Sequence, residues 1–294
     1  MRIFYCALHK IISGPDRFWQ ERSSIEAMAL ASAPSVEQVV ADWIWAEMIR
    51  NRKTPAFAVL IDADNASARH ADAIFEEVAT FGEAMIRRIY GNFADDRLQS
   101  WDKAVQAHAI LQQQQRNNTT GKNASDIALV IDAMDLLYKG TLNGVCIVSS
   151  DSDFTRLAQR LREEGLTVIG IGEKKAPEAF RKACNRFIYV ENIGSTVPGE
   201  AEAETKKEAP SKATPLVHRA MNALDDEDGW VKLGALGSKL HELAPDFDTR
   251  SFGHAKLSAL VKATSAFDMK RDASTHYLVR AKARQKTTNK AKKA

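Results

Sequence analysis

Short apolar runs alternate with amphipathic segments through the middle of the chain. The two clearest runs, 57–61 and 145–148, have the length and the apolar, partly β-branched composition of buried strands. Further strands are expected at 84–90, 110–114, 166–171 and 187–190, and helices at 71–78, 97–107, 123–138, 154–162 and 177–184. Strands that alternate with helices are typical of βαβ units, so residues 55–193 are expected to form an α/β domain with a mostly parallel sheet.

The pattern changes after residue 193. Residues 194–214 combine Pro198 and Pro210 with many charged and few large apolar side chains, which is typical of a flexible charged linker. An ordered pattern then resumes over residues 215–281. Its expected elements are helices at 216–224, 236–243 and 251–263, an extended piece at 230–233, and strands at 267–271 and 276–280.

Three helices followed by a hairpin suggest that residues 215–281 form a small winged-helix module. Its large apolar residues are expected in the core, namely Trp230, Phe247, Phe252 and Leu257. The chain then ends in a basic tail, because residues 282–294 contain six Lys or Arg and no acidic residue. Such a tail attracts nucleic-acid phosphates without regard to sequence.

The N-terminal extension, residues 1–54, is harder to interpret. An amphipathic helix is expected at 35–49, and we assign the extension no chemistry.

Charge and cysteine content narrow the class of protein. With 41 basic and 38 acidic residues among 294, the net charge of +3 gives no positive field over the whole chain, so any basic surface has to be local. Three distant cysteines, Cys6, Cys146 and Cys184, give neither a disulfide framework nor a zinc site. No apolar run approaches the roughly 18 residues that a membrane helix needs. We therefore expect a cytoplasmic protein with no membrane association.

Acidic residues follow both of the clearest strands. Asp62 comes directly after the first apolar run, and Asp151 comes shortly after the second. Open α/β sheets bind ligands beyond the carboxyl ends of their strands. If these two strands are neighbours in the middle of the sheet, the two carboxylates converge at such a site.

Three more acids lie near the same edge in the sequence: Asp64, Asp153, and Asp126 in the first turn of the helix 123–138. Carboxylates that converge without basic partners repel one another, and Mg²⁺ or Mn²⁺, which prefer oxygen ligands, remove that repulsion. Such a metal site suits phosphodiester hydrolysis. A simpler role remains open for two of these acids. Asp153, or Ser152 beside it, could simply cap the following helix, and Asp126 could do no more than oppose the helix dipole.

Three stretches of the chain resemble an NYN domain of the LabA-like type, within the PIN-like nuclease fold. They are Leu60-Ile-Asp62-Ala-Asp64-Asn65, the segment from Gly121 and Lys122 through Asp126 and Asp132, and Val148-Ser-Ser-Asp151-Ser-Asp153-Phe154. The resemblance implies a Rossmann-like sheet whose acidic pocket binds Mg²⁺ or Mn²⁺ and cleaves RNA. It implies that Asp62, Asp126 and Asp151 are catalytic metal ligands. It also implies that Asp153 is a further ligand or a residue that positions water.

Two polar residues complete the proposed acidic pocket as substrate-binding candidates. Asn65 is implied as a polar neighbour of the ligands, and Lys122 could meet a phosphate or hold a carboxylate. Lys122 could also be a solvated loop residue with no role in binding.

The C-terminal module resembles an OST-HTH, or LOTUS, domain. The resemblance lies in Asp228-Gly229-Trp230-Val231-Lys232-Leu233 and in Pro245 through Leu257. It implies a winged helix that binds RNA or brings RNA or protein partners to effectors. Arg250 and Lys256, in or near the expected recognition helix, are candidate phosphate contacts. The module is nearly neutral, since four acids occupy residues 225–228.

The leading hypothesis is a metal-dependent endoribonuclease whose winged-helix module recruits RNA or a protein partner. The alternative is an RNA-associated regulatory adaptor with little or no turnover. A phosphatase of the haloacid-dehalogenase kind would need a Thr where the chain has Ala66, and a toprim-like site would need a Glu where it has Asp62.

Overall fold

A computed structural model describes residues 53–115, 124–193, 207–224, 229–272 and 276–282. The expected helix at 35–49, the candidate Lys122 and almost all of the basic tail lie outside the described residues. By backbone contacts the chain divides into residues 1–51 and 52–294, and only the second unit contains described residues.

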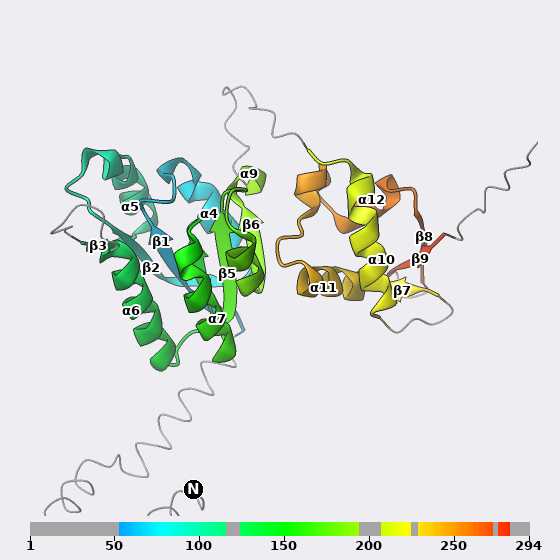
Figure 1. Ribbon diagram of the computed structural model, residues 1–294, viewed down its shortest axis with the longest axis horizontal. Helices are drawn as coiled ribbons and strands as arrows, with labels where there is room; N and C mark the ends of the chain where they lie inside the picture. The colour runs from blue at the N-terminus through cyan, green and yellow to red at the C-terminus, as the bar shows by residue number, and fades with distance from the viewer. Residues whose placement is uncertain (1–52, 116–123, 194–206, 225–228, 273–275, 283–294) are drawn as a thin grey trace, which may run out of the picture. The chain divides into compact units, whose positions relative to one another are not determined.

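Residues 56–189 build a six-stranded, wholly parallel sheet (Figure 1). Its strands are β1 (Ala56–Asp62), β2 (Glu83–Gly91), β3 (Leu111–Gln114), β4 (Gly144–Val148), β5 (Thr167–Gly172) and β6 (Arg186–Tyr189). They lie in the order β3-β2-β1-β4-β5-β6. The α/β, Rossmann-like fold with a mostly parallel sheet is confirmed, and so is the adjacency of the two most apolar strands.

Helices cover both faces of this sheet because its central strands are apolar on both sides. Alternate residues of β1 belong to different cores, with Leu60 in one and Ile61 in the other. The first core is closed by α6 (Ala124–Tyr138), α7 (Thr155–Glu163) and α8 (Glu178–Ala183). The second is closed by α4 (Ala71–Ala79), η2 (Asp96–Trp101), α5 (Asp102–His108) and α9 (Val190–Ile193).

The register of the central strands fixes where a ligand can bind. Ile61 of β1 pairs with Val148 of β4, so the next residues, Asp62 and Ser149, lie side by side at the carboxyl ends of these strands. The chain runs from β1 to β2 and β3 on one side, and β4 starts the other side. The point where the strand order reverses is the usual ligand crevice of such sheets.

The predicted helix 97–107 is two elements instead of one. A 3₁₀ segment, η2, precedes α5. Leu98 and Trp101, three residues apart, are both buried, and three residues per turn is the period of a 3₁₀ helix. Burial of these two side chains therefore explains the tighter coil.

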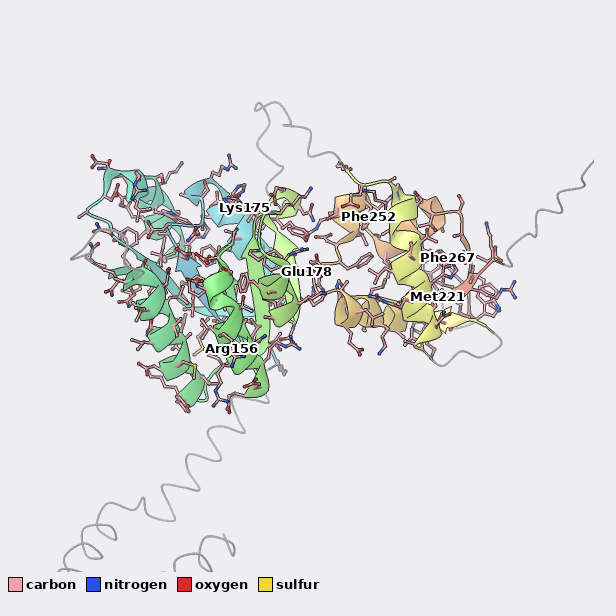
Figure 2. The ribbon with its side chains drawn as sticks, in the orientation of Figure 1. Arg156, Lys175, Glu178, Met221, Phe252 and Phe267 are labelled. Atoms are coloured by element: carbon pink, nitrogen blue, oxygen red, sulfur yellow. The ribbon has the colours of Figure 1, made fainter. Side chains whose placement is uncertain are left out.

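The C-terminal module has its own core and a three-stranded antiparallel sheet of order β7-β9-β8. Its elements are η4 (Pro210–Ala213), α10 (Thr214–Asn222), β7 (Val231–Lys232), α11 (Leu233–Leu243), η5 (Thr249–Phe252), α12 (Leu257–Ala263), β8 (Phe267–Arg271) and β9 (Tyr277–Ala281). Figure 2 shows Met221, Phe252 and Phe267 within this module. Ala213 is buried in its core, so packed structure begins before residue 215.

Two predictions about this module are wrong. The helix 251–263 is interrupted, because Gly253 has φ of +80° and Lys256 is extended, so Arg250 and Lys256 both precede α12. Trp230 is only partly buried and does not belong to the core cluster, whereas Phe247 is buried and Phe252 and Leu257 pack against the core.

Candidate functional site

Asp62 is a carboxylate held in place at the end of β1. Its side chain is 1% exposed. One oxygen accepts from the Ser149 hydroxyl at 2.8 Å and from the Asn65 side-chain amide at 2.9 Å. The other accepts from the backbone N–H groups of Asp64 and Asn65 at 3.2 and 3.3 Å. The turn after β1 therefore wraps around this carboxylate, and the sequence-predicted neighbour Asn65 lies in contact with it.

Ser149, the first residue after β4, connects the two strand ends. Its hydroxyl donates to Asp62 and accepts from the backbone N–H of Asp151 at 3.0 Å. The sequence analysis assigned it no role. A polar residue directly after the fully buried strand β4 is the signal that could have identified it.

Asp151 is the N-cap residue of the short 3₁₀ segment that follows β4. Its Oδ1 accepts from the backbone N–H of Asp153 at 2.9 Å, at the start of the 3₁₀ segment η3 (Ser152–Phe154). The capping side chain is therefore Asp151, at the start of η3, and not Asp153. Phe154 occupies the N-cap position of α7. The cap fixes Asp151 next to the Asp62–Ser149 pair.

Asp126 is placed among the other acids by the first turn of α6. Burial, the largest cause, and the negative charges of Asp62, Asp151, Asp153 and Asp64 together raise the pKa of its carboxyl to about 6. All four charges contribute because these carboxylates lie near Asp126. We call Asp62, Asp64, Asp126, Asp151 and Asp153 the acidic cluster.

The pKa of Asp62 is also raised from its ordinary value of 3.8. Burial is the main cause and the charge of Asp64 adds to it, while the hydrogen bonds from Ser149 and Asn65 act in the opposite direction. Ser149 and Asn65 therefore favour the ionised form, which is the form that binds a cation.

The donor set fits a hard divalent cation in its chemistry, since the cluster offers only carboxylate oxygens, with an amide and a hydroxyl beside them. As the side chains stand, no three His, Cys, Asp or Glu among the described residues form a ready-made metal-binding group. The fit therefore rests on the kind and charge of the ligands. Their positions would have to adjust when an ion binds.

Arg250, predicted to contact RNA, is held by acidic side chains. Its guanidinium donates to both carboxylate oxygens of Glu77, at 2.8 and 3.0 Å, and to Asp248 at 2.9 and 3.0 Å. These two partners raise its pKa against the opposing effect of burial. Lys256 is exposed just before α12. Neither residue hydrogen-bonds the acidic cluster, and their contact with RNA stays a prediction.

Asp132, a further acid on α6, has a structural role. Its carboxylate accepts from the Arg88 guanidinium and the Tyr90 hydroxyl, both on β2. Asp132 therefore ties α6 to β2.

Comparison with known protein families identifies both domains. The NYN domain model matches residues 56–191, and the OST-HTH/LOTUS domain model matches residues 204–279. The chain therefore carries an NYN domain, of the PIN-like nuclease fold, followed by an OST-HTH/LOTUS domain.

Individual relatives add little to this. The uncharacterized protein MJ0482 of Methanocaldococcus jannaschii is 28% identical over 168 residues, which cover 55% of this chain and 65% of that relative. A protein of unknown function from Vibrio parahaemolyticus, VPA0982, aligns with a TM-score of 0.40 at 17% identity, over 46% of this chain and 91% of its own. An uncharacterized protein of Nitrosomonas europaea, NE0665, aligns with a TM-score of 0.24 at 37% identity, over 30% of this chain and 88% of its own.

None of the helices within the described ranges is long and apolar enough to cross a lipid bilayer.

Proposed function

We propose that the protein is a metal-dependent endoribonuclease that hydrolyses RNA phosphodiester bonds at the acidic cluster. The observation that carries the proposal is the raised pKa of Asp126, whose causes include four neighbouring carboxylates at the switch point of an NYN domain. Carboxylates that lie close enough to raise one another's pKa are typical of sites that hold cations.

The proposed ligands of Mg²⁺ or Mn²⁺ are Asp62, Asp126, Asp151 and Asp153. A bound ion would activate the attacking water and stabilise charge on the phosphate and the leaving oxygen. The chain's own contribution is positioning. Ser149 and Asn65 hold Asp62, and the cap on η3 holds Asp151.

The OST-HTH/LOTUS domain is proposed to recruit the RNA, and a protein partner is a further candidate ligand for it. Two binding sites on one chain raise the effective concentration of RNA at the cluster. Asn65 and Lys122 would then contact the bound substrate, with Lys256 and Arg250 as candidate contacts in the second domain.

One observation favours the alternative, an RNA-associated adaptor with little turnover. The described residues contain no ready-made group of three metal-binding side chains. The adaptor would bind RNA through the same surfaces without cutting it.

One experiment distinguishes the nuclease from the adaptor. Purified full-length protein is incubated with a labelled mixed-sequence single-stranded RNA and Mn²⁺, and both binding and cleavage are measured. The nuclease function predicts internal cuts that stop on addition of EDTA. Binding of intact RNA with no cuts, under Mn²⁺ and Mg²⁺ alike, would contradict it and support the adaptor.

A further inference from the structure

Trp230 of the C-terminal domain lies at the surface and contacts two cations through its ring. It directly precedes β7 and is only partly buried. The Lys270 ammonium lies 4.2 Å from the centre of its ring, and the Arg280 guanidinium lies 4.6 Å from it. A large aromatic side chain kept out of its domain's core and placed among cations needs a reason other than packing.

The strand register shows that these residues share one face of the three-stranded sheet. Val231 of β7 pairs with Val279 of β9, and both are buried against the core. Side chains alternate across a strand, so Trp230 and Arg280, adjacent to these valines, point to the opposite side. The contact between the Arg280 guanidinium and the Trp230 ring agrees with this placement.

Two further residues complete this surface. Lys232 of β7 and Lys270 of β8 both pair with Leu278 of β9, and both lysines are exposed. We call Trp230, Lys232, Lys270, Leu278 and Arg280 the outer face.

The charge of the outer face is positive. Its three cations share this side of the sheet with one acid, Asp268, which pairs with Arg280 in the β8–β9 register and makes an ion pair of 3.7 Å with it. Residues 282–294 follow β9 directly in the sequence and contain six Lys or Arg and no acid. Four acids at residues 225–228 precede Trp230 in the sequence, so the charge of this part of the chain is mixed. Stacking, more than charge, therefore has to supply the affinity for any ligand here.

We propose that the outer face binds single-stranded RNA, with one base stacked on the Trp230 ring and phosphates paired with Lys232, Lys270 and Arg280. Aromatic rings flanked by cations are suited to this ligand, because every base offers a flat face and every nucleotide a phosphate. Lys270 has a long flexible stem, so its ammonium can leave the ring for a phosphate when a base arrives. The proposal rests on RNA being the substrate of the neighbouring NYN domain.

The outer face does not include Arg250 and Lys256, the two phosphate contacts predicted for this domain from the sequence. Arg250 is held by Glu77 and Asp248, whereas Lys232 and Lys270 are exposed and have no ion pair among the described residues. Arg250 is therefore less available to a phosphate than the two lysines of the outer face, whereas Lys256, which is also exposed, stays a candidate contact.

The test measures RNA affinity of the full-length chain by fluorescence anisotropy in EDTA, where metal-dependent cleavage does not occur. We expect Trp230→Ala to weaken binding of a labelled single-stranded RNA by about 5-fold or more, in line with the loss of one stacked base. Trp230→Phe keeps an aromatic face and should recover most of that loss. Lys212→Gln, which removes an exposed charge from η4, is the matched control and should bind like the wild type.

A second variant covers the case in which Trp230→Ala fails to fold. Lys232→Gln with Lys270→Gln changes only exposed positions and should weaken binding and flatten its dependence on salt, because fewer counterions are released. Affinity equal to the wild type in this double variant, and in Trp230→Ala where that variant folds, would overturn the proposal and leave the face to a protein ligand. Wild-type cleavage in Mn²⁺ is scored separately, so failure of the nuclease function and failure of the outer face give different results.

Discussion

The Ser149 hydroxyl donates to the Asp62 carboxylate at 2.8 Å, and this bond joins the ends of the two central strands. Because Ser149 also accepts from the N–H of Asp151, it sets the spacing between the two acids. Neither carboxylate is placed by its own strand alone. The geometry of the acidic cluster therefore depends on a residue that is not itself an acid.

Replacing Ser149 with Ala should weaken metal binding. The substitution removes a hydrogen bond that favours ionised Asp62 and frees the backbone of Asp151. Partners that orient metal ligands typically change metal affinity about 10-fold or more. We expect the Mn²⁺ concentration for half-maximal cleavage to rise by about that factor. Ser150→Ala is the matched control, since the Ser150 hydroxyl accepts from the Glu173 N–H and does not contact Asp62. An unchanged Mn²⁺ requirement in Ser149→Ala would contradict this role.

Asp126→Asn should stabilise the metal-free protein near neutral pH. The pKa of Asp126 is raised to about 6 in the folded chain from an ordinary 3.8, so its ionised form is disfavoured by folding. This destabilisation is absent below about pH 4, where the carboxyl is protonated in both states, and it develops fully as the pH rises above about 6. We expect a gain in Tm of about 2–4 °C in EDTA near neutral pH.

The same measurement at acidic pH checks the sign. The gain from Asp126→Asn should shrink as the pH falls through the range between 6 and 3.8. Asp135→Asn, an exposed position on the same helix, makes the same charge change and should shift Tm little at any pH. A lower Tm for Asp126→Asn in EDTA would show that the carboxylate stabilises the fold.

The overall sheet and the approximate site could be predicted from the sequence, whereas the finer contacts could not. Strands as apolar as β1 and β4 have to be buried in the middle of a sheet, so the convergence of Asp62 and Asp151 follows from pattern alone. The break at Gly253 depends on one residue's backbone angle, which no periodicity reveals. The pairing of Arg250 with Glu77 joins residues 173 positions apart, and no local pattern encodes it.

His241 should make the protein less stable in acid. Burial, the largest cause, and the charge of Arg186 together lower its pKa to about 4 from an ordinary 6.5, against the opposing charge of Asp248. The unfolded chain therefore binds more protons between these values, so stability is full above about pH 6.5 and falls as the pH drops toward 4. His241→Phe, which keeps a ring beside Phe247, should reduce the loss of Tm over this range. His276→Phe, at an exposed position, should leave the loss unchanged.

Arg250→Ala should lower stability more than it lowers RNA affinity. Its removal leaves Asp248, which is 8% exposed, without its ion-pair partner, and an uncompensated buried carboxylate is strongly destabilising. We expect a decrease in the free energy of unfolding of about 2 kcal/mol, because the pair is partly solvated. RNA affinity, measured well below Tm, should change less than in Trp230→Ala. A larger loss of RNA affinity in Arg250→Ala, with Tm unchanged, would instead establish Arg250 as a phosphate contact.

The central claim is that the acidic cluster cuts RNA, and single-turnover cleavage in Mn²⁺ by matched Asp→Asn variants tests it most directly. Wild type and the exposed-site control Asp135→Asn should cut at equal rates. Asp62→Asn and Asp151→Asn should lose about 100-fold or more of that rate while remaining folded and able to bind RNA. Cleavage by Asp151→Asn at the wild-type rate would place the activity outside the cluster and contradict the account.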